Sequence, residues 1–181
     1  MRQDLCHMKR HAHILTVALA SLALAASVAS LYVHYQMLAD SSYSSFCDVS
    51  ETVTCEAVLT SRYGSVFGVP VAAGGAIWAA LVLLLGIVGM RSSRSEVTGR
   101  VAGYIFVLST VGLAGILYLG YASFFILRQI CPLCIATYIA VIGLFVVSGA
   151  ATSGLTALPA RLGRDLRTVL ASPLAVTLAV V

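Results

Sequence analysis

The sequence predicts an all-α integral membrane protein: a four-helix bundle with a polar extracytoplasmic loop, a short lid helix in that loop and a partial fifth helix at the end of the chain. Of the 181 residues, 60% are hydrophobic and 10% are charged, and the mean hydropathy is +0.98. Soluble domains carry about 25% charged residues, so this composition excludes a soluble globular protein. Four apolar runs, each long enough to cross the ~30 Å hydrocarbon core of a bilayer, complete the prediction.

The first apolar run extends from residue 14 to about residue 38 and follows a basic segment, residues 1–13. The small residues Ala26–Ser30 also resemble a signal-peptide cleavage region, but apolar residues continue beyond them, which favours a retained helix. Cys6 is expected to be a free cytosolic thiol. The alternative is a metal site formed by Cys6, His7, His11 and His13.

Residues 39–68 form the one substantial polar segment, rich in Ser, Thr, Asp and Glu. Ser50 is a suitable N-cap for a short helix from about residue 51 to residue 62, and Gly64 is suited to end it. A modest apolar stripe would allow this helix to lie on the bundle as a lid. A solvated loop without a helix is the alternative.

The other three apolar runs cover about residues 69–90, 101–127 and 131–150. The second run is rich in Ala and Gly, which let helix backbones approach closely in lipid, so we expect it to be central to the packing. Pro132 occupies the first turn of the fourth run, where a helix tolerates proline. Residues 151–181 combine an amphipathic, arginine-bearing segment with an apolar tail that is too short to span comfortably.

The distribution of basic residues predicts the orientation. All but Arg62 and Arg128 of the 11 Lys and Arg residues fall on one side of a four-crossing model. The positive-inside rule therefore places residues 1–13 and 151–181 in the cytoplasm, on either side of a membrane domain at residues 14–150. The basic residues form short clusters between apolar runs, so we expect a lipid bilayer as their partner and no nucleic acid.

The most informative motif is Cys131-Pro-Leu-Cys134, at the start of the fourth run. Cys131, Cys134 and Tyr138 are spaced i, i+3, i+7, which places them on one face of a helix. A helix N-terminus favours a thiolate, and a C-x-x-C pair there can close and reopen as a disulfide. The alternative is two buried cysteines that only pack.

Cys47 and Cys55 in the polar loop form a second cysteine pair. Both pairs are expected on the oxidising side of the membrane, where they could act as a relay. A mobile pair can collect electrons from an outside protein through mixed disulfides and pass them to the fixed pair. The spacing leaves open which loop cysteine meets the partner. A structural zinc site with four cysteines is the rival, but the separation of Cys47 from Cys55 is wider than the usual zinc-knuckle spacing, so no metal is expected.

The fixed pair needs an acceptor inside the bundle. The apolar runs offer no haem-type ligands, so the natural acceptor is a lipid-soluble quinone. Cys134 lies deeper along the helix than Cys131 and is the better candidate to react with it. Tyr138, one turn further on, can donate a hydrogen bond to a quinone oxygen on which negative charge develops; simple packing of this tyrosine is the alternative.

An ordered set of motifs supports this interpretation: Cys47-Asp48-Val49, Cys55, Ser61-Arg62-Tyr63-Gly64, Phe67-Gly68 and Cys131-x-x-Cys134-Ile-x-Thr-Tyr138. Over about residues 14–150 the chain resembles the vitamin K epoxide reductase family, in its bacterial branch. The resemblance implies a four-helix bundle around a quinone, with Cys131/Cys134 as the active disulfide and Cys47/Cys55 as the shuttle.

The resemblance also implies that Ser61 belongs to the segment that caps the quinone pocket and that Tyr138 hydrogen-bonds the quinone. It implies a bacterial cytoplasmic-membrane enzyme that oxidises a thioredoxin-like partner and reduces ubiquinone or menaquinone, so that exported proteins acquire disulfides. We expect the partner to be a separate protein, because no thioredoxin-like domain is encoded here.

Two features depart from the animal enzymes. The chain contains no asparagine, which those enzymes use as a second quinone hydrogen bond, and this argues against vitamin K epoxide as the substrate. Tyr63 stands where they have tryptophan. The rival interpretations are a quinone-linked oxidase of the DsbB type, in which the C-x-x-C pair precedes the other pair, and a non-enzymatic membrane scaffold with two structural disulfides.

Overall fold

The computed structural model describes residues 2–40, 43–50, 52–92 and 95–151 of the chain. These residues form four long helices, each long and apolar enough to cross a membrane, so the predicted four-helix membrane protein is confirmed. Their bounds are α1 (Arg2–Ala39), α3 (Val71–Arg91), α4 (Ser95–Tyr121), which continues into the π-helical turn η1 (Ala122–Leu127), and α5 (Pro132–Ala151). The predicted fifth helix lies outside the described residues.

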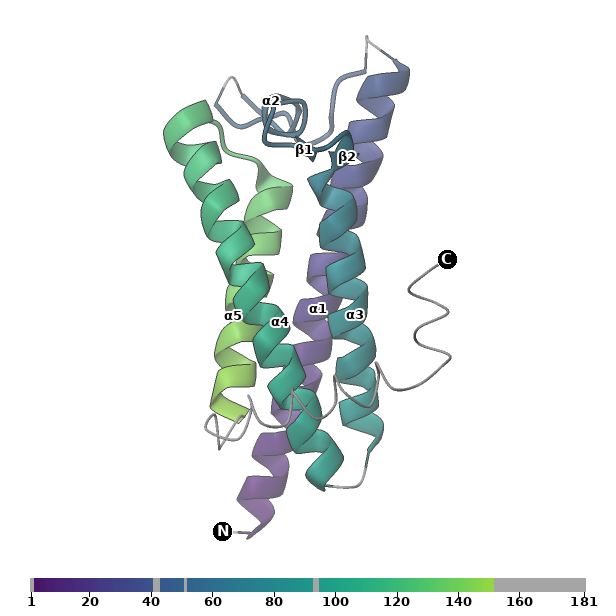
Figure 1. The fold of residues 1–181 in the computed structure, drawn as a ribbon, viewed down its shortest axis with the longest axis vertical. Helices are drawn as coiled ribbons and strands as arrows, with labels where there is room; N and C mark the ends of the chain where they lie inside the picture. The colour runs from purple at the N-terminus through teal and green to yellow at the C-terminus, as the bar shows by residue number, and fades with distance from the viewer. Residues whose placement is uncertain (1, 41–42, 51, 93–94, 152–181) are drawn as a thin grey trace. The chain divides into compact units, whose positions relative to one another are not determined.

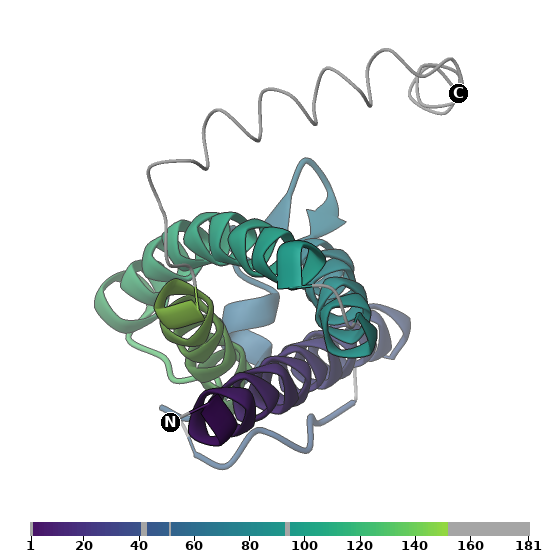
Figure 2. The ribbon, with the colours of Figure 1, turned by 90° about the horizontal axis from the view of Figure 1, so that it is seen from below.

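The four helices surround a common axis. Figure 2, viewed along the bundle, shows α1 opposite α4, with α3 and α5 between them, and each helix packs on its two neighbours. The core includes Ala20, Val82 and Leu144, all fully buried. Ala23, Ala79 and Ala140 form a second buried cluster, in which small side chains let α1, α3 and α5 approach closely.

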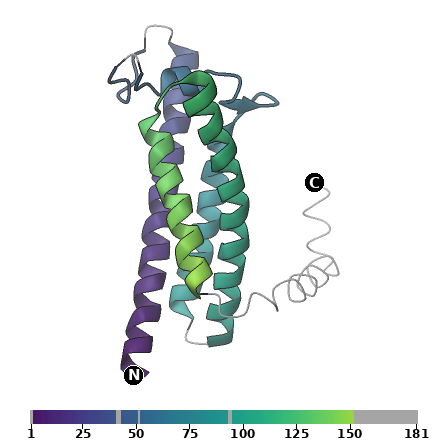
Figure 3. The same cartoon turned by 90° about the vertical axis from the view of Figure 1, so that its left-hand side faces the viewer.

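The polar segment covers one end of the bundle, where α1 ends and α3 and α5 begin (Figures 1 and 3). It contains the short helix α2 (Glu56–Leu59) and a hairpin of β1 (Ser65–Val66) and β2 (Val69–Pro70), paired antiparallel. Leu59, the last residue of α2, is buried against the bundle, so this helix is a lid on it.

The predicted lid helix from residue 51 to residue 62 is wrong in extent, and Ser50 is not its cap. The Ser50 hydroxyl accepts from the Val53 N–H instead, and the backbone of Thr52 and Thr54 pairs with Ile130 of a distant segment. These tertiary hydrogen bonds use the backbone groups that a longer helix would need. At the other end, a Cβ on Gly64 would overlap the Leu59 carbonyl, so the turn after α2 requires glycine.

Candidate redox site

Four cysteines gather where the polar segment meets the start of α5. Cys47 and Cys55 are joined by a disulfide, whereas Cys131 and Cys134 are free thiols. The Cys131 Sγ lies 3.7 Å from the Cys55 Sγ, and both side chains are buried in an apolar cluster with Val33. The structure therefore brings the two predicted pairs together, with Cys55 as the loop cysteine that faces Cys131.

A short parallel bridge between two backbone segments fixes this register. The Ile130 N–H donates to the Thr52 carbonyl at 2.8 Å, and the Thr54 N–H donates to the Ile130 carbonyl at 3.0 Å. Cys55 directly follows Thr54, and Cys131 directly follows Ile130. Backbone pairing, rather than a bond between the sulfurs, thus holds the two pairs in contact.

Cys131 immediately precedes α5 and lies just outside the membrane-spanning part of that helix. A hydrogen bond from the Cys134 side chain lowers the pKa of Cys131 most, and the backbone N–H groups of Cys134 and Leu133 lower it further. Burial and the negative charge of Asp48 act in the opposite direction, but the net pKa is lowered. Since the thiolate is the nucleophile in disulfide exchange, Cys131 is suited to react with the adjacent disulfide.

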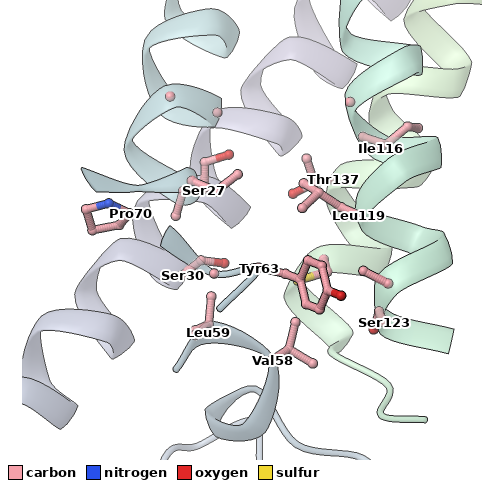
Figure 4. A pocket seen from close by; sticks show the side chains of 18 of the residues that line it. Ser27, Ser30, Val58, Leu59, Tyr63, Pro70, Ile116, Leu119, Ser123 and Thr137 are labelled. Carbon is pink, nitrogen blue, oxygen red and sulfur yellow. The ribbon is translucent and has the colours of Figure 1, made fainter. Parts of the chain in front are cut away.

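A cavity of about 440 Å³ lies beneath α2 and the hairpin, between the four helices. Cys134, Thr137 and Tyr138 of α5 line one wall, and Val58, Leu59 and Tyr63 close it from the lid; Figure 4 shows Tyr63 and Thr137 facing this space. A mostly apolar cavity with a few hydroxyl groups, in the 300–1,000 Å³ range of small-molecule sites, fits a lipid-soluble ligand.

The two thiols of α5 have different surroundings. Cys134 lines the cavity, whereas Cys131 does not line it and faces Cys55. Tyr138 lines the cavity one turn beyond Cys134, and no described residue forms a hydrogen bond with its hydroxyl. This arrangement places one sulfur at the loop disulfide and the other at the cavity, as a relay requires.

Ser61 is not on the cavity wall. Its hydroxyl donates to the Val58 carbonyl at 2.7 Å and accepts from the Tyr63 N–H at 3.2 Å. Ser61 therefore shapes the turn that carries Tyr63 into the wall. The Arg62 Nη2 donates to the Tyr63 hydroxyl at 2.7 Å and so fixes the orientation of this ring.

Sequence reasoning missed several residues of the site. Ser27 and Ser30 line the cavity, and their i, i+3 spacing in an apolar helix was the available signal. Trp78, the single tryptophan, also lines it, and its Nε1 donates to the Leu108 carbonyl at 3.0 Å. Asp48 belongs to the Cys47-Asp48-Val49 motif, but the motif predicted no role for its side chain. Among the described side chains, no group of three or more His, Cys, Asp or Glu residues is placed to hold a metal ion.

A model of the vitamin K epoxide reductase family matches residues 14–149. The chain belongs to this family. It is 32% identical over 149 residues to vitamin K epoxide reductase complex subunit 1 of Mus musculus, which covers 75% of this chain and 87% of the mouse protein. The Rattus norvegicus protein of the same name is 32% identical over 148 residues, 74% of this chain and 86% of the rat protein. Membership of this family implies that the protein is a membrane oxidoreductase that acts on disulfides and quinones.

Proposed function

We propose that this protein transfers electrons from an extracytoplasmic dithiol protein through Cys47/Cys55 and Cys131/Cys134 to a quinone, and so supports disulfide formation in exported proteins. The observation that carries the proposal is the 3.7 Å between the sulfurs of Cys55 and Cys131, with Cys134 on the wall of the adjacent cavity. This is the order of contacts that a two-pair relay needs.

The exchange begins at the loop disulfide. Cys55 is fully buried and faces Cys131, whereas Cys47 is 5% exposed, so we assign the attack of the partner thiolate to the Cys47 sulfur. A bond forms between the partner and Cys47, the Cys47–Cys55 bond breaks, and Cys55 leaves as a thiolate. The second thiol of the partner then attacks the partner sulfur that is bonded to Cys47. The partner's own disulfide forms, and Cys47 is released as a thiolate.

The second exchange starts with the α5 pair as a disulfide. The Cys55 thiolate attacks the Cys131 sulfur, so that the Cys55–Cys131 bond forms, the Cys131–Cys134 bond breaks and Cys134 leaves as a thiolate. Cys47 then attacks Cys55, restores the loop disulfide and releases Cys131. The product has an oxidised loop pair and a reduced α5 pair, which is the arrangement in the structure.

The cavity suits a quinone, which supplies a lipid-soluble acceptor of two electrons and two protons. Cys134 would deliver the electrons, and the Tyr138 hydroxyl would donate a hydrogen bond to a ring oxygen. Gly74 of α3 and Gly115 of α4 line the cavity and are exposed, and both lie within membrane-spanning segments. We propose that the quinone enters from the bilayer between them.

The proposal also includes the partner protein and the orientation of the chain in the membrane. A thioredoxin-like protein, separate from this chain, would reduce the loop pair on the outer side of a bacterial cytoplasmic membrane, with both ends of the four-crossing bundle in the cytoplasm. The concentration of Lys and Arg on the opposite side from the cysteine loop supports this orientation.

Anaerobic mixing of the oxidised protein with excess reduced thioredoxin-like protein and a water-soluble quinone tests the relay. We expect the wild type to reduce quinone, Cys134→Ala to be inactive, and Cys47→Ala to fail with the protein donor but to work with a small dithiol. Cys6→Ala, predicted to lie on the other side of the membrane, is the matched control. Quinone that stays oxidised while all four site cysteines resist reduction would show that the disulfides are structural.

The same assay identifies the acceptor. Ubiquinone, menaquinone and vitamin K epoxide are offered separately, because the names of the mammalian relatives include the epoxide. We expect turnover with the quinones. Faster turnover with the epoxide would leave the direction of electron flow unchanged, because the epoxide also accepts two electrons, but it would contradict the assignment of a quinone as the acceptor.

A further inference from the structure

We propose that Asp48 is a positioning residue for the exchange between the two cysteine pairs: its carboxylate holds Cys55 beside Cys131 while the loop disulfide is open. The role rests on the relay proposed above, and it concerns a side chain that neither lines the cavity nor carries electrons.

The carboxylate binds the start of α2. The Asp48 Oδ1 accepts from the Cys55 N–H at 2.6 Å and from the Glu56 N–H at 3.3 Å. Such first-turn N–H groups have no partner within their own helix, and a charged acceptor makes the stronger kind of hydrogen bond with them. Asp48 also directly follows Cys47, so a single side chain connects both ends of the disulfide loop.

This connection matters most when the disulfide is open. In the relay, Cys47 is first bonded to the partner and then released as a thiol, and the Cys55 thiolate has to find the Cys131 sulfur without a bond to Cys47. With the covalent link broken, the noncovalent restraints on the loop include the Asp48 hydrogen bonds, the backbone bridge of Thr52 and Thr54 to Ile130, and the pairing of Val49 with Val53. The first two of these act on Cys55 and on the residues directly before it.

The Cys47 side chain is held differently. Its Sγ lies 3.0 Å from the Ser45 Oγ, a contact local to the loop, and the side chain belongs to the same buried cluster as Cys55 and Cys131. Cys55 is therefore the loop cysteine whose backbone is held at the membrane pair, by Asp48 and through Thr54.

Asp48 has an alternative role as a proton acceptor for a reacting thiol. The two roles predict different behaviour for Asp48→Asn, because an amide oxygen still accepts the two N–H groups but does not take up a proton near neutral pH. The positioning role predicts that Asn preserves exchange and that Ala does not. The negative charge also raises the pKa of Cys131, so its removal does not slow reactions of this thiol.

The test uses the full chain with Cys47→Ala, which lacks the thiol that resolves the Cys55–Cys131 mixed disulfide. The α5 pair is oxidised, Cys55 is reduced, and the formation of the mixed disulfide is followed by acid quench and peptide mass spectrometry. We expect Asp48→Ala to slow this step about tenfold or more and Asp48→Asn to remain within about threefold of the parent. Glu56→Gln, a change of the neighbouring exposed acid, is the matched control and should have no effect.

Quinone reduction by a small dithiol, which acts on the α5 pair directly, reports whether each variant is folded and should be equal in all of them. An Asn variant as slow as the Ala variant overturns the positioning role in favour of the charge. An Ala variant as fast as the parent, or an Ala variant that also loses dithiol-driven quinone reduction, overturns it as well. Absence of the mixed disulfide in the parent itself would instead refute the relay.

Discussion

The two halves of the bundle contain similar residues but pack differently. In the half far from α2, Ala20, Val82 and Leu144 of three helices are fully buried against one another. In the half beneath α2, the same helices surround a cavity of about 440 Å³. Figure 1 shows the two halves along one set of continuous helices, so the difference arises from side chains and not from new elements.

Glycines show how this difference arises. In the closed half, a Cβ at Gly89 would lie 3.1 Å from the Val101 Cγ1, so close helix approach there depends on the absence of a side chain. At Gly74 and Gly115, in the half with the cavity, an added Cβ would meet nothing within 4 Å. Gly112, also on the cavity wall, would place a Cβ 2.8 Å from the Trp78 Cζ2, so a glycine allows close approach or leaves room according to what faces it.

The largest expected effect comes from a change in the half beneath α2, at the contact between the two cysteine pairs. Cys55→Ser should reduce quinone turnover driven by the partner protein by on the order of 10³-fold or more, because the loop sulfur that faces Cys131 is then missing. Quinone reduction by a small dithiol and the thermal unfolding temperature in detergent should stay close to wild type. Partner-driven turnover that persists would show that electrons reach Cys131 by another route.

A matched pair of truncations compares the halves directly. Leu144→Ala removes a fully buried side chain from the closed half and should destabilise the protein by about 2–5 kcal/mol. Leu119→Ala enlarges a cavity that already exists, so the loss of stability should be smaller, about 1 kcal/mol. Unfolding in detergent measures both, and equal losses would mean that the cavity half is packed as tightly as the other.

Tyr138→Phe tests whether the cavity is the site of quinone reduction. Removal of a hydroxyl that stabilises developing charge should lower quinone turnover by roughly 10–100-fold. Exchange between Cys55 and Cys131 should remain unchanged, because Tyr138 lines the cavity and not the sulfur contact. Tyr118→Phe, on the exposed face of α4, is the control. Equal effects of the two changes would assign Tyr138 to packing.

The smallest expected effect is a change in pH dependence. The Cys134 side chain lowers the pKa of Cys131, so Cys134→Ala should raise that pKa relative to Cys134→Ser, which keeps a hydrogen-bond donor. A thiol reacts as its thiolate, so attack of Cys131 on the loop disulfide should need a higher pH in the Ala variant.

Combining Asp48→Asn with Cys134→Ser should move the pH dependence the other way, because it removes the charge that raises the pKa of Cys131. The rate of mixed-disulfide formation as a function of pH measures both shifts. Identical profiles for the Ala and Ser variants would show that the side chain of Cys134 does not set the reactivity of Cys131.

The sequence alone determined the membrane-spanning elements and the order of residues on α5. A backbone inside a bilayer has to satisfy its own hydrogen bonds, so apolar runs of sufficient length become helices regardless of their neighbours. The spacing of Cys131, Cys134 and Tyr138 likewise fixes their succession along one helix face, because helix geometry is local. The structure agrees in placing Cys134 and Tyr138 on the cavity wall.

Tertiary structure decided what depends on segments that are far apart in the chain. The pairing of Thr52 and Thr54 with Ile130 shortened the lid helix and selected Cys55 as the neighbour of Cys131, 76 residues away. No local pattern encodes that pairing, since it exists only when α4 and η1 return the chain to the lid. The cavity has the same origin, because a glycine opens or closes a bundle according to the side chain that another helix places opposite it.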